Sequence, residues 1–293
     1  MRKQVFHRPE DIPKELQLAP GRQLTLTRPL VMGILNCTPD SFSDGGLHAT
    51  PEMAVEHALK MEEQGADIID VGGESTRPGA QPVEEDEEMQ RVIPVIQRLR
   101  DLTDITISID TYKAKVADAA LKAGADIVND VSALRFDTNL MGVVIEHKAP
   151  IILMHMQGTP RDMQNDPHYE DCVTEICVFF ERRIKLAVGH GVDRSKILLD
   201  PGLGFGKRVR DNLEILARFN EFTQFKVPVI VAASRKGFIG HVHSSDIPAE
   251  ERLGGSLAAA MMGIVGGASI VRAHDVKETV EALKVLQAVR SVE

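Results

Sequence analysis

The 293-residue sequence predicts an α/β fold, a (β/α)8 TIM barrel with a short N-terminal extension. Three observations favour this fold class: short apolar runs recur along the chain, helical patterns separate them, and the runs end in polar or charged residues. Continuous apolar runs are typical of strands buried on both faces of a parallel sheet, and their alternation with helices predicts βαβ units. Eight units in about 260 residues match the size of a (β/α)8 barrel, which we favour over a doubly wound open sheet.

Residues 1–28 form the predicted extension, and residues 29–293 form one predicted (β/α)8 domain without a linker or a low-complexity segment. The strand pattern is clearest where a helical stretch ends at a glycine and an apolar run follows, as in 65–70 and 124–129. Glycine suits the position that follows a helix C-terminus. The predicted strands occupy residues 30–35, 67–71, 105–109, 126–128, 150–154, 197–199, 228–232 and 269–271.

Helix boundaries are indicated by capping residues. Thr50 and Pro51 predict the N-cap and the first position of a helix. A run of acidic residues at 84–88 predicts the start of the next helix, because the helix dipole favours negative charge there. Asp275 and Glu278, three residues apart, predict a capping box at the start of the last helix.

Charge and aromatic content argue against a nucleic-acid partner. The chain carries 34 basic and 43 acidic residues, for a net charge of −9, and it has 4% aromatic residues and no tryptophan. Nucleic-acid surfaces need an excess of positive charge, and single strands also need aromatic platforms for stacking. We therefore expect small-molecule substrates.

Cysteine content and hydropathy predict a cytoplasmic protein that does not enter a membrane. Cys37, Cys172 and Cys177 are too few and too scattered for a disulfide framework, which favours a reducing compartment. Residues 1–20 lack the apolar segment of a signal peptide. The most apolar stretch, 257–271, is shorter than the roughly 20 residues that a membrane span needs, and we interpret it as a buried helix followed by a strand.

Polar residues at the ends of the predicted strands form the candidate active site. In a barrel, the C-terminal ends of all strands meet at one mouth, so these residues converge there. One of them alone could cap a loop, but eight strand ends of this kind favour a function. The residues are Asn36, Asp70, Asp110, Asn129 with Asp130, His155, Asp200, Ser234 with Lys236, and Arg272 with His274.

The acidic and amide groups of this set suit a flat heterocyclic substrate. Asp110, Asn129 and Asp200 supply hydrogen-bond acceptors and one amide, which match amino and ring N–H donors. Lys236 could form a Schiff base, but its neighbours Ser234 and Arg235 favour a role in binding an anion or a carbonyl group.

The cationic groups of the set suit an anion such as phosphate. They are Arg77, Lys236, Arg272 and His274. A neutral Asn36 together with a phosphate oxygen could share a Mg²⁺ ion, because that ion takes few protein ligands and binds substrate phosphates.

Two glycine-rich loops follow predicted strands. The loop at 202–207 has neither the spacing of a phosphate-binding P-loop nor that of a dinucleotide-binding loop, and we predict a passive, flexible connection. The loop at 72–79 is long, polar and hinged by glycines, so it is either a mobile lid over the site or a passive loop.

Taken together, several of these segments resemble dihydropteroate synthases. The matching runs are MGILNCTPDSFSDGG at 32–46, DVGGESTRPG at 70–79, SIDT at 108–111, NDV at 129–131, LDPG at 199–202, SRK at 234–236 and RAHD at 272–275. The resemblance implies an enzyme of folate biosynthesis. It would join 6-hydroxymethyl-7,8-dihydropterin diphosphate to 4-aminobenzoate, giving 7,8-dihydropteroate and diphosphate.

The resemblance also implies a role for each matching residue. The pterin site would consist of Asp110, Asn129, Asp200 and Lys236, and the diphosphate site of Thr76, Arg272 and His274. The 4-aminobenzoate site would consist of Phe42, Thr76, Arg77, Pro78 and Phe205, and Asn36 would contact Mg²⁺. The chemistry itself would fall to Asp110, Lys236, Arg272 and His274, in a Mg²⁺-assisted, SN1-like substitution. Members of the family are homodimers and are targets of sulfonamides, which mimic 4-aminobenzoate.

Two alternatives remain at this stage. A pterin-binding methyltransferase barrel would recognise a similar ring with a similar acidic pocket, but it would not need the Asn36 loop, the loop at 72–79 or the run at 234–236. A non-catalytic pterin-binding paralogue would differ in its activity rather than in its fold. The presence of both the diphosphate and the 4-aminobenzoate segments favours the synthase.

Overall fold

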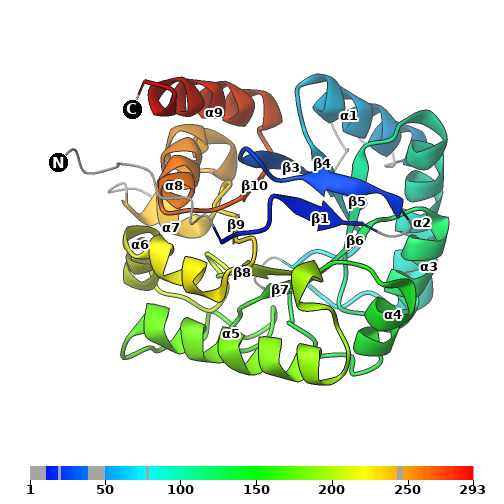
Figure 1. The fold of residues 1–293 in the computed structure, drawn as a ribbon, viewed down its shortest axis with the longest axis horizontal. Coiled ribbons are helices and arrows are strands. Elements are labelled where there is room, and N and C mark those ends of the chain that lie inside the picture. The colour runs from blue at the N-terminus through cyan, green and yellow to red at the C-terminus, as the bar shows by residue number, and fades with distance from the viewer. Residues whose placement is uncertain (1–10, 19–20, 39–49, 77–78, 243–246, 293) are drawn as a thin grey trace.

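The computed structural model describes residues 11–18, 21–38, 50–76, 79–242 and 247–292 (Figure 1). Its main sheet contains the strands β3 (Leu30–Asn36), β4 (Ile68–Gly72), β5 (Thr106–Asp110), β6 (Ile127–Asp130), β7 (Ile151–Met154), β8 (Ile197–Asp200), β9 (Ile230–Val231) and β10 (Ile270–Ala273). The helices are α1 (Pro51–Glu63), α2 (Glu85–Leu102), α3 (Ala114–Ala123), α4 (Leu140–His147), α5 (Cys172–Gly189), α6 (Val209–Ala217), α7 (Gly237–Val242), α8 (Leu253–Val265) and α9 (Val276–Arg290). Short 3₁₀ helices cover Arg194–Lys196, Phe219–Phe225 and Ala249–Glu251.

The strands close into a barrel, as the sequence predicts. They pair in parallel in the order β8-β7-β6-β5-β4-β3-β10-β9, so neighbours in sequence are neighbours in space. A parallel bridge between Leu199 and Val229, with a 3.0 Å hydrogen bond from Leu199 N to Pro228 O, joins the two ends of this order. The helices surround the ring (Figure 1). The doubly wound open sheet is therefore excluded.

Local sequence signals fix where the helices begin and end. The Thr50 hydroxyl caps α1 by accepting a hydrogen bond from Met53 N, and Pro51 occupies the first helical position, as predicted. Helix α3 ends at Gly124, whose φ of 116° lies in the left-handed region that glycine adopts without strain. Helix α2 begins with four acidic residues, which also agrees with the prediction.

The predicted capping box at the start of the last helix is wrong. Asp275 is the N-cap of α9, but its carboxylate makes no cap hydrogen bond. It instead accepts hydrogen bonds from Arg235 Nη2 at 2.6 Å and Arg235 Nε at 3.1 Å. The pair with Arg235 has two charged partners and two hydrogen bonds, whereas a cap bond has one charged partner, which explains why the side chain turns to Arg235.

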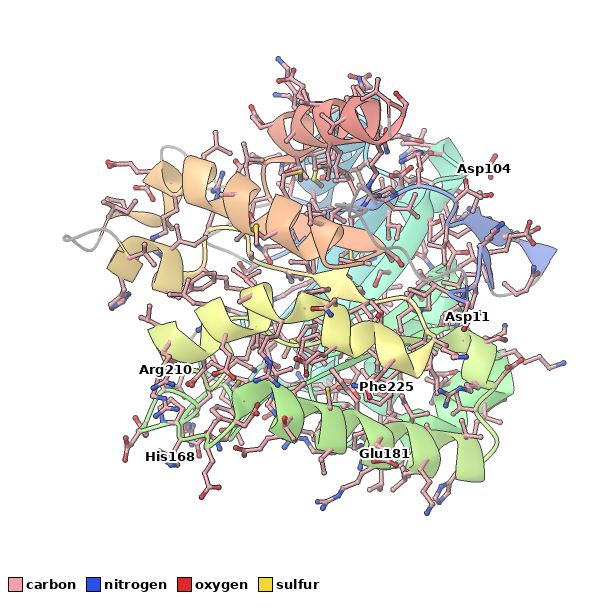
Figure 2. All side chains as sticks on the ribbon, turned by 60° about the vertical axis from the view of Figure 1, so that its left-hand side comes forward. Asp11, Asp104, His168, Glu181, Arg210 and Phe225 are labelled. Atoms are coloured by element: carbon pink, nitrogen blue, oxygen red, sulfur yellow. The ribbon has the colours of Figure 1, made fainter. Side chains whose placement is uncertain are left out.

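The described part of the N-terminal segment closes the floor of the barrel. Strands β1 (Glu15–Gln17) and β2 (Gln23–Thr25) form an antiparallel hairpin. Its residues Leu16 and Leu26 are fully buried in one apolar cluster with the first residues of the barrel strands. In Figure 2 the hairpin lies at the end marked by Asp11 and Asp104, whereas His168 and Arg210 lie at the opposite end. The hairpin thus leaves the C-terminal mouth open for a site.

The apolar stretch at 257–271 forms the end of α8 and the start of β10, as predicted. None of the described helices is long and apolar enough to cross a membrane. Cys37, Cys172 and Cys177 are all free thiols in the described structure.

Candidate active site

The strand register aligns polar residues at the C-terminal mouth of the barrel. Gly72 of β4 pairs with Asp110 of β5, and Asp110 pairs with Asn129 of β6. Met154 of β7 pairs with Asp200 of β8. Because these strands are parallel, their ends share one rim, which is where barrel enzymes carry their sites. Asn36 is the last residue of β3 on the same rim.

Arg272 organises the centre of this rim. Its Nε donates to Asp70 Oδ2 at 2.6 Å, and its Nη2 donates to Asp110 Oδ2 at 2.8 Å. Asn129 Nδ2 donates to the same Asp70 oxygen at 3.0 Å. Asp70 is fully buried, and its Oδ1 has no hydrogen-bond partner within the described part of the chain. Asp70 therefore fixes both Arg272 and Asn129.

Burial and the neighbouring charges determine the pKa values of the residues in this cluster. Burial raises the pKa of Asp110 to about 7, although the positive charge of Arg272 opposes the rise. Burial alone would lower the pKa of Arg272, but the carboxylates of Asp70 and Asp110 outweigh it and the net shift is upward. The guanidinium is thus always charged, while Asp110 titrates near neutral pH.

Asp200 is held by the loop that follows β8. Its Oδ1 accepts a 2.7 Å hydrogen bond from Gly202 N, and burial raises its pKa while Lys236 and Arg272 oppose the rise. Gly202 has a φ of 70°, and a Cβ at this position would lie 2.0 Å from His155 O. Only glycine fits here.

Lys207 lies beneath this loop and is almost fully buried. Its Nζ donates to Gly202 O at 2.8 Å and Phe205 O at 3.0 Å, and it lies 3.0 Å from His155 Nδ1. Burial lowers the pKa of Lys207 to about 7. The prediction of a passive, flexible loop at 202–207 is therefore wrong, because a buried ammonium group binds several of its carbonyl oxygens.

Lys236 and Phe205 lie together, although the sequence separates them by 31 positions. The Lys236 Nζ atom lies 4.0 Å from the centroid of the Phe205 ring, which is a close cation–π contact. Phe205 itself is nearly buried. The residue predicted for the pterin site and the residue predicted for the 4-aminobenzoate site thus share one wall.

His274 is paired with Ser234. The Ser234 Oγ lies 3.0 Å from His274 Nδ1 and accepts a 3.1 Å hydrogen bond from His274 N. This arrangement favours the tautomer with its proton on Nε2. Burial, with the nearby charges of Arg272, lowers the pKa of His274 to about 3. At neutral pH His274 offers an N–H donor, and not the positive charge that we expected from the sequence.

The long loop after β4 is described in part. Thr76 is half-buried in it. Phe42, Arg77 and Pro78 lie outside the described residues. The described ends of the loop are anchored: Arg91 Nη1 donates to Gly73 O at 2.7 Å, and Lys113 binds both Glu74 and Val83 O.

The donor set fits one Mg²⁺ ion only if a substrate supplies most of the ligands. Asn36 offers a hard amide oxygen at the rim. Among the described residues, no group of three or more His, Cys, Asp or Glu side chains forms a metal cage. A single amide oxygen completed by phosphate oxygens and water is compatible with this arrangement.

The strand ends, rather than a groove beside α5, carry the chemistry. A groove of about 920 Å³ lies between α5 and the 3₁₀ helix Phe219–Phe225 and contains none of the rim residues. Its walls hold no cluster comparable with the one around Arg272. We therefore place the candidate active site at the barrel mouth.

Three residues with a structural role at this mouth were missed from the sequence. Asp70 was recognised as a strand end but was given no role, Lys207 was assigned to a passive loop, and Lys113 was not considered. A lysine directly after a glycine-rich strand end could have indicated Lys207. Lys113 gives no local signal, because its partners lie 25 to 39 positions away.

Comparison with known proteins agrees with this geometry. The family described as pterin binding enzyme matches residues 32–274. The dihydropteroate synthase of Escherichia coli K12 is 47% identical over 273 residues, which cover 93% of this chain and 96% of that protein. The synthase of Bacillus subtilis is 48% identical and is covered over 88% of both chains.

Solved structures give the same result. The Yersinia pestis dihydropteroate synthase in complex with a sulfonamide drug superposes with a TM-score of 0.89 at 45% identity, over 94% of this chain and 99% of that one. The Xanthomonas albilineans enzyme with 4-aminobenzoic acid has a TM-score of 0.89 at 46% identity, covering 96% and 100%. The same enzyme in complex with 7,8-dihydropteroate has a TM-score of 0.86 at 44% identity, covering 95% and 100%.

The fold, the rim and these matches define the class of protein as a pterin-binding barrel enzyme. Within that class, the chain belongs to the dihydropteroate synthase family.

Proposed function

We propose that this protein joins 6-hydroxymethyl-7,8-dihydropterin diphosphate to 4-aminobenzoate, releasing 7,8-dihydropteroate and diphosphate in folate biosynthesis. The observation that carries the proposal is the rim cluster in which Arg272 bridges Asp70 and Asp110 beside Asn129. Membership of the synthase family supports it, as does the named 7,8-dihydropteroate complex of the Xanthomonas albilineans relative.

The pterin ring binds to the acceptors and donors at the base of the mouth. Asp110 and Asp200 accept hydrogen bonds from the amino and ring N–H groups, and Asn129 and Lys236 donate to the ring carbonyl and nitrogen atoms. The buried position of Asp200 and the 11% exposure of the Asp110 side chain support this role, since acceptor oxygens gain strength away from water. Asp70 positions Asn129 and does not contact the ring.

The diphosphate binds on the side of Arg272 and His274. Arg272 holds Asp70 and Asp110 through Nε and Nη2 and donates to the diphosphate through Nη1, and neutral His274 donates to it from Nε2. Thr76 adds a hydroxyl donor from the loop after β4. Asn36 is the protein ligand of a Mg²⁺ ion, which when bound supplies positive charge to the phosphate oxygens.

The residues promote a dissociative substitution. The C–O bond to the diphosphate breaks, its electron pair leaves with the diphosphate, and Arg272 and His274 stabilise the departing charge. When the C–O bond breaks, the pterin methylene becomes electron-poor and the ring delocalises its positive charge. The carboxylates of Asp110 and Asp200 stabilise that charge. The amine nitrogen of 4-aminobenzoate then forms the C–N bond. The arylammonium group that results is strongly acidic and loses its proton to water, so no strong protein base is needed.

The 4-aminobenzoate binds between Phe205 and the loop that carries Thr76. Phe205 offers an apolar ring face beside the Lys236 ammonium group. The family resemblance assigns Phe42, Arg77 and Pro78 to the same site. Sulfonamides, which mimic 4-aminobenzoate, are expected to compete there, and the sulfonamide complex of the Yersinia pestis relative supports this expectation.

We further propose a cytoplasmic homodimer. Free cysteines support a reducing compartment.

The dimer interface is proposed at the helices α8 and α9, which lie next to each other (Figure 1). Apolar side chains on both helices are exposed. They are Met262, Val285 and Val289. Sedimentation of the wild type against Met262→Lys tests this face, and a wild type that stays monomeric would contradict it.

The activity is tested by identifying the product of the purified protein. Dihydropterin diphosphate, Mg²⁺ and 4-aminobenzoate are supplied together, and the mixture is resolved by chromatography and mass spectrometry. Dihydropteroate in the complete mixture supports the synthase. Binding of the pterin without this product, or methyl transfer from a supplied methylfolate, would replace the synthase with the paralogue or the methyltransferase.

A further inference from the structure

A second buried charge cluster lies outside the rim, at the start of α3. The Lys113 Nζ donates to Glu74 Oε2, Glu88 Oε2 and Val83 O, each at 2.5 Å. The side chains of Lys113 and Glu74 are 9% exposed, and that of Glu88 is 1% exposed. None of these residues belongs to the pterin or diphosphate site, so the reaction described above does not explain the cluster.

The cluster fastens together the two ends of one loop. Glu74 lies at the start of the loop after β4 and Val83 lies at its end. Besides sharing Lys113, the two are joined directly, because Val83 N donates to Glu74 Oε2 at 3.1 Å. Tyr112, next to Lys113, adds a 3.2 Å hydrogen bond from its hydroxyl to Glu74 Oε1. These contacts tie the two ends of the loop to each other and to the residues that directly precede α3.

The start of the loop is also packed tightly against α2. A Cβ on Gly73 would lie 2.8 Å from Val92 Cγ1 and 2.9 Å from Glu88 Cγ. Glu88 thus touches the loop backbone with its methylene groups and Lys113 with its carboxylate. Lys113 joins three segments in this way: the loop, α2 and the start of α3.

Charge balance makes Lys113 the central member. It is the ammonium group between two buried carboxylates, and buried carboxylates are costly without a partner. Burial raises the pKa of Glu88, and the bonds to Lys113 oppose that rise. Burial alone would lower the pKa of Lys113, but its bonds to Glu74 and Glu88 outweigh it and raise the pKa. Removing the lysine would leave Glu74 and Glu88 facing each other.

We propose that Lys113 is a positioning residue for 4-aminobenzoate: it holds Glu74 and Val83 together and so fixes the loop that presents Thr76 to the second substrate. The inference rests on the proposed function. Lys113 touches no substrate. Its effect falls mainly on 4-aminobenzoate, because the contacts that hold Asp110, Asn129, Asp200 and Arg272 do not involve the loop, and Thr76 is only one of the donors to the diphosphate.

The test compares the KM for 4-aminobenzoate with the KM for dihydropterin diphosphate in the Lys113→Met and Glu74→Gln variants of the full chain. In both, we expect the KM for 4-aminobenzoate to rise about tenfold or more, while the KM for dihydropterin diphosphate changes less than about twofold. Glu74→Gln keeps the size of the side chain and so remains informative if Lys113→Met does not fold. A general loss of structure would raise both KM values or lower kcat alone.

Lys115 provides the matched control. It lies in the first turn of α3, two residues after Lys113, and pairs with Glu85 of α2 at 2.6 Å, but its side chain is 74% exposed. Lys115→Met should leave both KM values unchanged. An unchanged 4-aminobenzoate KM in Glu74→Gln, or an equal rise in both KM values, would overturn the inference. A wild type that makes no dihydropteroate would instead reject the proposed function.

Discussion

Arg272 Nη2 donates a 2.8 Å hydrogen bond to Asp110 Oδ2, although the two residues lie on β10 and β5, with β3 and β4 between them in the sheet. The contact therefore spans the mouth of the barrel. Both side chains are largely buried, and the guanidinium holds a carboxylate whose pKa burial has raised to about 7. The cation and the acid are thus paired directly with each other beside the position where we place the substrate.

Replacing Asp110 with Asn should abolish turnover while leaving the fold intact. The variant loses a charged acceptor for the pterin, and a loss of about 3 kcal/mol corresponds to a decrease of roughly 10²-fold in rate. Arg272 keeps its 2.6 Å bond to Asp70, so folding survives. The measurement is kcat together with the melting temperature. Turnover within threefold of the wild type would show that Asp110 has no part in the reaction.

Replacing Phe205 with Leu should weaken binding of 4-aminobenzoate. Leucine preserves apolar bulk but removes the ring face that lies 4.0 Å from Lys236 Nζ. A contact of about 1 kcal/mol between the Phe205 ring and the aromatic ring of 4-aminobenzoate corresponds to a rise of roughly fivefold in the KM for that substrate. Steady-state kinetics at saturating dihydropterin diphosphate measures this. A KM that does not move would remove Phe205 from the site.

Replacing Gly202 with Ala should destabilise the protein. The new Cβ would lie 2.0 Å from His155 O at a φ of 70°, so the loop that holds Asp200 has to shift. Overpacking and left-handed strain together cost about 3 kcal/mol, which lowers the melting temperature by several degrees. Gly142→Ala is the control, because its Cβ meets open space within α4. Equal melting temperatures for both variants would contradict this account of the loop.

Replacing His274 with Gln should flatten the pH dependence of stability. The pKa of His274 is about 3 in the folded protein and near 6.5 when unfolded, so between these values only the unfolded chain binds the proton. The free energy of unfolding therefore rises with pH across this window and is fully gained above pH 6.5. The variant should lose about 1.4 kcal/mol per pH unit of slope between pH 4 and 6. The raised pKa of Asp110 gives an opposite slope in both proteins and cancels in their difference.

Denaturant titration at several pH values measures this slope. If the two proteins have parallel stability profiles between pH 4 and 6, then His274 is protonated in the folded state. Ser234 Oγ would then accept a hydrogen bond from the Nδ1–H of the imidazolium instead of donating one to Nδ1.

The sequence predicts the barrel because parallel strands and their helices are encoded by local patterns. Each strand is a short apolar run, and glycine or capping residues mark the helix ends beside it. The rim residues follow from the same patterns, because a polar residue after a buried run lies at the end of a strand. Asp110, Asn129 and Asp200 could therefore be placed together before any contact was known.

Contacts between distant segments could not be predicted in this way. Lys113 looks like an ordinary surface lysine in sequence, and only the fold places it between two carboxylates. Lys207 follows a glycine-rich strand end, but the sequence does not show that carbonyl oxygens surround its ammonium group. Asp275 was predicted to cap its own helix, but Arg235, 40 positions earlier, competes for its carboxylate. The positive charge expected of His274 is removed by burial and by neighbours that only the folded chain brings close.

The cluster of Arg272 and Asp110 at the barrel mouth couples the loss of diphosphate to the attack by the amine of 4-aminobenzoate. The most direct measurement follows diphosphate and dihydropteroate in the same reaction, with and without 4-aminobenzoate. The account predicts one diphosphate released for each dihydropteroate formed, with little release when 4-aminobenzoate is omitted. Equal diphosphate release in its absence, or release without any dihydropteroate, would contradict the account.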